Sequence, residues 1–224
     1  MSRPTWKCPP PATRSPRPDR CLIKRAPVRG FAGYRVNGTP ADCVALGAYH
    51  WEKVNLVLAG INLGSNLGNS MWHSGTLAAA KQAVLLGLRG IALSAPVTAE
   101  DPNFDTLKPA LEKVLGLLIP DDGLSLVNVN FPKGEPKGLC WTRQSVRHYD
   151  GKVVPGKDPM GRTHFWFTVI PIEPTEEGTD RWAVGHGYVS MTPLRLDLTN
   201  EIERLRRERA TLSDSTAGHR MRLR

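Results

Sequence analysis

The chain has 224 residues, 40% of them hydrophobic, which is enough to bury the core of one or two domains. No apolar run reaches the roughly 18 residues of a transmembrane helix, and the N-terminus lacks the apolar stretch of a secretory signal. The net charge of +9 belongs to the two ends, because residues 38–200 carry 14 basic against 16 acidic side chains. We therefore expect a soluble cytoplasmic protein with no membrane or nucleic-acid partner.

Three segments differ in composition. Residues 1–37 contain seven prolines and nine Lys or Arg side chains without an apolar period, which predicts a disordered basic arm. Residues 38–200 have the composition of a globular domain, and residues 201–224 predict a charge-rich helix and a basic tail. RNA binding by the arm is an alternative, although charge runs are usually solvated tails.

From residue 38 onward, helical and strand patterns alternate. Small and apolar residues predict a helix over 41–51, and the apolar run 54–59 predicts a buried parallel strand. A Gly/Asn-rich loop over 60–69, a helix over 74–88 and a short strand over 90–94 follow. Strand, loop, helix and strand in this order form a βαβ unit.

The later elements continue the α/β pattern. Apolar residues at helical spacing predict a helix over 107–119, and the next run predicts a strand over 124–131. Further strands are predicted over 139–146, 163–172 and 188–194, with the Gly/Lys/Pro-rich stretch before residue 163 as a hairpin loop. A final helix is predicted over 201–212.

The loop after the first predicted strand carries residues suited to ligand binding. Ligands of α/β sheets bind beyond the carboxyl ends of the parallel strands. Gly60 and Gly64 allow the backbone to approach a ligand closely. Asn62 and Asn66 offer amide oxygens to a cation and N–H donors to a phosphate.

The helix that follows this loop opens with a second set of candidate residues. His73 precedes Ser74, Gly75 and Thr76, and a helix N-terminus binds anions through its free N–H groups. A Gly/Asn loop is often only a turn, and Ser-Gly-Thr is often only a cap. Together on one βα junction they favour a phosphate site. His73 is a candidate general acid, although a histidine at a helix start is more often a cap or packing residue.

These segments resemble the SurE family, survival-protein nucleotidases that hydrolyse nucleoside 5′- and 3′-monophosphates. The resemblance covers residues 38 to about 205 and rests on ordered motifs, namely Gly38–Val44, Ala59–Gly68, His73–Thr76, Asn128–Pro132, Trp141–Gln144 and Gly187–Leu194. It implies a Rossmann-like three-layer α/β fold with helices on both faces of the sheet. It also implies a C-terminal β-hairpin and helix that assemble a homodimer or homotetramer.

The same resemblance implies a divalent cation, manganese or magnesium, at the active site. Asn62 matches one metal ligand of the family, while Asn66, Ser74, Gly75 and Thr76 match positions that line the phosphate site. The family's other main ligands are an Asp pair in an Asn-Asp-Asp-Gly motif near the start of the chain.

Two departures from the family bear on activity. The Asn-Asp-Asp-Gly motif and the first strands of the family fold have no counterpart in residues 1–37, so the catalytic residues are unknown. The one Asp-Asp-Gly sequence, at residues 121–123, predicts a turn. The resemblance thus predicts a metal-dependent nucleoside monophosphate phosphatase, and the alternative is a truncated, inactive relative that acts only through oligomer contacts.

Overall fold

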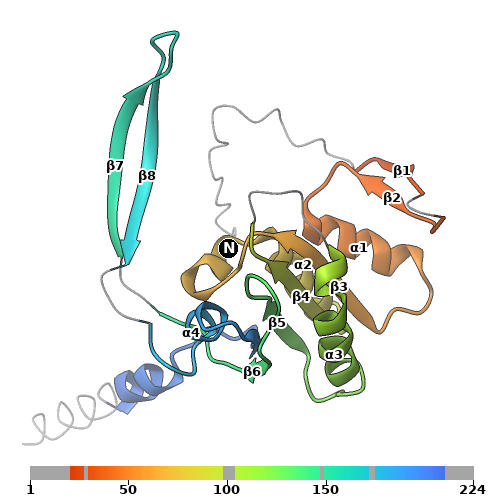
Figure 1. The fold of residues 1–224 in the computed structure, drawn as a ribbon. Helices are drawn as coiled ribbons and strands as arrows, with labels where there is room; N and C mark the ends of the chain where they lie inside the picture. The colour runs from red at the N-terminus through yellow and green to blue at the C-terminus, as the bar shows by residue number, and fades with distance from the viewer. Residues whose placement is uncertain (1–20, 28–29, 98–103, 147–148, 172–174, 210–224) are drawn as a thin grey trace, which may run out of the picture.

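A mixed five-stranded sheet forms the centre of the computed structural model, which describes residues 21–27, 30–97, 104–146, 149–171 and 175–209. The strand order is β3-β4-β5-β9-β6, and helices cover both faces (Figure 1). Strands β3 (Leu56–Leu63), β4 (Arg89–Ala95) and β5 (Leu126–Asn130) are parallel to one another. β9 (Val189–Pro193) is antiparallel to β5, and β6 (Leu139–Trp141) is parallel to β9. The predicted α/β class is confirmed.

Helix α2 (Gly75–Leu85) packs on one face of the sheet, with α1 (Pro40–His50) against it. Leu77, Ala80 and Ala83 of α2 are fully buried. Gly90 of β4 makes this close packing possible, because a Cβ atom there would lie 2.2 Å from the Ala80 carbonyl oxygen. The small residues of α2 therefore bring the helix backbone almost into contact with the sheet.

Helix α3 (Lys108–Leu118) covers the opposite face and follows the short 3-10 helix η2 (Phe104–Leu107). Its buried residues Val114 and Leu118 join a cluster with Ile91, Val127 and Phe131 of the strands and their ends. Alternate residues of β4 and β5 thus face α2 and α3, as a sheet buried on both sides requires.

A long hairpin, β7 (Tyr149–Lys157) and β8 (Thr163–Pro171), extends away from the body of the molecule (Figure 1). The predicted hairpin paired 139–146 with 163–172 and placed the Gly/Lys/Pro-rich stretch in its loop, and this was wrong. That stretch forms β7 itself, while only residues 139–141 of the other segment form a strand, in the central sheet. Pro155 is tolerated because both strands of an isolated ribbon are edge strands.

The turn of this hairpin is organised by Asp158. Its carboxylate accepts hydrogen bonds from the backbone N–H of Met160 and Arg162, both at 2.9 Å. The backbone and side-chain hydrogen bonds of Arg162 hold the pKa of Asp158 below its usual value. This turn forms the tip of the hairpin, which projects away from the central sheet (Figure 1).

Part of the predicted disordered arm is ordered. β1 (Ile23–Arg25) and β2 (Tyr34–Val36) form an antiparallel pair beside α1, where the Tyr34 ring contacts His50 and Trp51. Residues 1–20 lie outside the described part of the chain. The C-terminal helix is described over residues 201–209, and residues 210–224 also lie outside it. Among the described helices, none has the length and apolarity to cross a membrane.

Candidate phosphate-binding site

The end of strand β3 places Asn62 at the carboxyl edge of the parallel strands. The predicted loop over 60–69 begins later than expected, because β3 continues to Leu63 and Asn62 lies opposite Ser94 of β4. Gly60 is required within this strand. Its φ is +136°, and a Cβ atom there would lie 2.4 Å from the Leu93 carbonyl oxygen.

The side chain of Asn62 is half-buried and held in one orientation. Its Nδ2 donates a hydrogen bond to the Gly64 carbonyl oxygen at 2.6 Å. This bond uses one of the two N–H donors of the amide nitrogen and leaves the Oδ1 acceptor available to a ligand. An amide oxygen is a suitable but neutral ligand for a hard cation.

Asn66 is largely buried and bonded to the two neighbouring strands. It is only 8% exposed, and its Nδ2 donates to the Ser94 hydroxyl at 2.7 Å. Its backbone N–H donates to Asn130 Oδ1 at 2.8 Å, and its carbonyl accepts from the amide nitrogens of Asn128 and Asn130. These bonds anchor the loop that carries Asn66 on β4 and β5.

A buried carboxylate fixes the other end of the loop. Asp180 is fully buried at the start of the short helix α4 (Asp180–Gly185), which the sequence did not predict. One carboxylate oxygen accepts from Gly68 N–H at 2.7 Å, and the other accepts from Ser145 N–H at 3.0 Å and Arg181 N–H at 2.7 Å. Asp180 therefore joins three segments that are far apart in sequence.

The loop leads through the 3-10 helix η1 (Gly68–His73) into the N-terminus of α2. Ser74 is the N-cap, and its hydroxyl accepts from Leu77 N–H at 3.1 Å. The Ser74 carbonyl accepts from Ala78 N–H, so Gly75 and Thr76 provide the first-turn N–H groups that remain for an anion. His73 is exposed directly before this turn.

The described residues do not form a complete metal site. No group of three or more His, Cys, Asp or Glu side chains gathers among them. Asp180 is occupied by backbone N–H groups, and the Asp121-Asp122-Gly123 sequence forms the predicted turn before β5, at the amino end of that strand. Among the described residues, Asn62 offers one neutral amide oxygen, which by itself holds a divalent cation only weakly.

An asparagine at the end of a parallel strand, followed by a capped helix N-terminus, is an arrangement with which α/β proteins bind anions at a βα junction. The model of the family "Survival protein SurE" matches residues 13–151, which is more than half of the chain. The chain belongs to the SurE family. The match starts within the arm, earlier than the expected resemblance from residue 38.

Proteins that align with most of this chain carry the same family name. The "5'-nucleotidase SurE 1" of Thermus thermophilus is 46% identical over 170 residues, which cover 74% of this chain and 67% of that protein. The "5'-nucleotidase SurE" of Erythrobacter litoralis is 37% identical over 215 residues, covering 89% and 85%. The crystal structure of the SurE protein from Aquifex aeolicus superposes with a TM-score of 0.66 at 39% identity, covering 80% of this chain and 76% of that one.

Proposed function

We propose that this chain is a nucleotidase that hydrolyses nucleoside 5′-monophosphates, and 3′-monophosphates in addition, to nucleoside and phosphate. The observation that carries the proposal is the N-terminus of α2, capped by Ser74, beside Asn62 at the end of β3. The relatives that share this segment are named 5'-nucleotidases. A phosphate group accepts hydrogen bonds from such N–H groups and is stabilised by the helix dipole.

The reaction transfers the phosphoryl group from the nucleoside oxygen to water. Water attacks phosphorus, the phosphorus–oxygen ester bond breaks, and the leaving nucleoside oxygen takes up a proton. The attacking water gives up one proton in the same reaction, which restores the proton donor. We propose His73 as the donor of the proton to the leaving oxygen, because it is exposed directly before the phosphate-binding turn. Gly75, Thr76 and the Ser74 cap hold the phosphate during the attack.

We propose a divalent cation, Mn²⁺ or Mg²⁺, as the cofactor, with Asn62 as a ligand on this chain. When bound, such an ion supplies charge neutralisation at the phosphate. One amide oxygen binds a divalent ion weakly, so we expect the chain alone to bind Mn²⁺ with a Kd above about 1 mM. Electron paramagnetic resonance of free Mn²⁺ measures this directly, and micromolar binding would contradict the expectation.

Release of phosphate from AMP and GMP, with and without Mn²⁺, tests the proposed activity. We expect Mn²⁺-stimulated release, which Asn62→Ala lowers by about 100-fold or more because the amide oxygen beside the phosphate is lost. Asn55→Ala, at the exposed amino end of the same strand region, is the matched control and keeps wild-type turnover. Turnover that is unchanged by Asn62→Ala would remove Asn62 from the site.

The second candidate function is that of an inactive relative that acts through oligomer contacts. The observation that favours it is the lack of a metal-ligating cluster among the described residues. It predicts no phosphate release under any metal condition from a chain that nevertheless assembles. The same assay therefore separates the two functions.

We also propose that the chain forms a homodimer or homotetramer through the β7–β8 hairpin. Its side chains Val153, Phe165 and Trp166 are 57%, 57% and 64% exposed. A two-stranded ribbon is at best marginally stable alone in water, so a second copy that covers these side chains would stabilise it.

Removing this apolar surface should dissociate the assembly. We expect wild-type chain to show two or four times the mass of one chain in light scattering after size-exclusion chromatography. The double variant Phe165→Ser with Trp166→Ser should show the mass of a single chain, because it deletes the largest apolar contacts. An assembly of unchanged mass in the double variant would exclude the hairpin as the contact.

A further inference from the structure

A cavity of about 680 Å³ lies at the carboxyl ends of β3, β4 and β5, on the side of the sheet covered by α3. Leu63 and Ala95 at the strand ends form part of its lining, with Ala110 of α3 and Leu139 of β6. Its volume is typical of small-molecule sites, which are mostly apolar and located beyond the ends of parallel strands. Asn66, Ser94 and Asn130 lie on the other side of the sheet, so this cavity is separate from the loop network.

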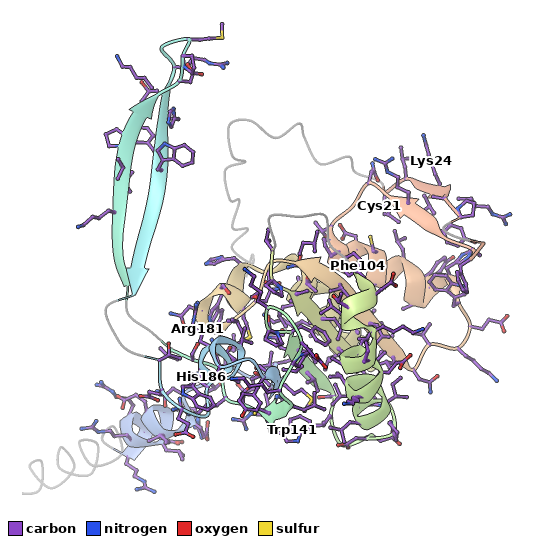
Figure 2. The ribbon with its side chains drawn as sticks, in the orientation of Figure 1. Cys21, Lys24, Phe104, Trp141, Arg181 and His186 are labelled. Carbon is purple, nitrogen blue, oxygen red and sulfur yellow. The ribbon has the colours of Figure 1, made fainter. Side chains whose placement is uncertain are left out.

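Apolar side chains and prolines form much of the walls of the cavity. Four prolines contribute to them, namely Pro96, Pro109, Pro132 and Pro136. Phe104 stands at its edge, 42% exposed, at the start of the α3 segment near the ends of the strands (Figure 2). An exposed aromatic ring over apolar walls suits a planar aromatic ring, since stacking requires little reorganisation of the protein.

The rim of the cavity carries charged side chains of both signs. Lys113 and Lys133 are exposed there together with Glu135. Two ammonium groups attract an anionic ligand and donate hydrogen bonds, while the carboxylate accepts them. This combination suits the polar edge of a nucleobase and the hydroxyls of a sugar, around an apolar centre.

The cavity and Asn62 lie at the same edge of the sheet, beyond the carboxyl ends of the parallel strands. Leu63 directly follows Asn62 in β3, and Gly64 N–H donates to the Ala95 carbonyl oxygen at 2.8 Å. A ligand that spans the end of β3 would therefore meet Asn62 on one side of the sheet and the cavity on the other. We infer that this cavity binds the nucleoside part of a mononucleotide and stacks its base on Phe104. This inference rests on the proposed nucleotidase function.

Isothermal titration of adenosine into the full chain tests the inference without any phosphate ester. We expect adenosine to bind, and Phe104→Ala to raise its Kd about tenfold, as expected for the loss of one stacking contact. Phe104→Trp should restore binding because it keeps an aromatic surface. Phe31→Ala removes a phenyl ring that is 78% exposed and does not line the cavity, so this control should bind adenosine like wild type.

The outcomes separate this inference from the proposed function. Adenosine binding that is lost in Phe104→Ala, in a chain that releases no phosphate from AMP, would support the cavity and refute the nucleotidase. Phosphate release from AMP by a chain that does not bind adenosine would refute the cavity and leave the nucleotidase. Equal Kd values in Phe104→Ala and Phe31→Ala would also overturn the inference.

Discussion

Asp180→Ala should lower the free energy of unfolding by about 4 kcal/mol, the largest effect we expect of any single substitution outside the apolar core. The carboxylate is fully buried and accepts hydrogen bonds from three backbone N–H groups, those of Gly68, Ser145 and Arg181. Alanine leaves the buried N–H groups of Gly68 and Ser145, and the partly buried N–H of Arg181, without this acceptor, and each unsatisfied buried donor costs roughly 1–3 kcal/mol. Urea denaturation followed by tryptophan fluorescence measures the change.

Asp158→Ala is the matched control for this substitution. Asp158 also accepts from two backbone N–H groups, but it does so in the exposed turn of the β7–β8 hairpin, where water replaces the lost acceptor. We expect a change below about 1 kcal/mol there. Equal losses for the two variants would show that burial of Asp180 is not the source of its effect.

The substitution at Asp180 should also affect ligand binding. Gly68 begins the η1 segment that leads to Ser74, so release of this loop end would disturb the N-terminus of α2.

Asp180→Asn keeps the shape of the side chain, but it places an NH₂ donor opposite one of the backbone N–H donors. We expect Asp180→Asn to lose less stability than Asp180→Ala. The comparison separates the effect of the lost hydrogen-bond acceptor from the effect of the smaller side chain.

Gly90→Ala should destabilise the fold by about 3 kcal/mol through a clash between sheet and helix. The added Cβ atom would lie 2.2 Å from the Ala80 carbonyl oxygen and 2.8 Å from its carbonyl carbon. Both are backbone atoms, so no side-chain rotation relieves the contact, and α2 must move away from β4. Because α2 carries Ser74 at its N-terminus, phosphate release should fall as well.

The same change in an exposed helix provides the control for Gly90. Gly116 lies on the exposed side of α3, and a Cβ atom there would meet nothing within 4 Å. Gly116→Ala should therefore stabilise the protein by about 0.5–1 kcal/mol, since alanine is the better helix former. Thermal unfolding measures the stability of both variants. A lower stability of Gly116→Ala would contradict the expected gain from helix propensity.

The local elements of the fold were predictable because their signals are local. The apolar run at 54–59 and the small-residue helix that follows Ser74 are present as β3 and α2, and Ser74 caps that helix. Asn62 is found at the end of a parallel strand beside this helix. Periodicity and capping residues fix such features within a few turns of chain.

The features that sequence reasoning missed depend on contacts between distant segments. Asp180 lies 112 residues from Gly68, and no spacing rule joins them. The hydrogen bonds of Asn66 involve Ser94 and Asn130, which belong to two other strands. β7 was assigned to a loop because its Gly, Lys and Pro residues are unfavourable in a buried sheet, yet they are compatible with an isolated ribbon. The motif Asn128–Pro132 was the signal that could have revealed the network under the loop.

The position of β9 between β5 and β6 has a consequence for synthesis of the chain. While only the residues up to the end of the hairpin have emerged from a ribosome, β3, β4 and β5 can pair, but one edge of β5 stays open. β6 at that stage lacks the strand with which it pairs, and the Thr142 hydroxyl lacks its partners Ser190 and Thr192. The last strand in the described part of the chain is thus an inner strand of the sheet. We expect the nascent domain to need protection of this edge from aggregation until residue 193 is free of the ribosome.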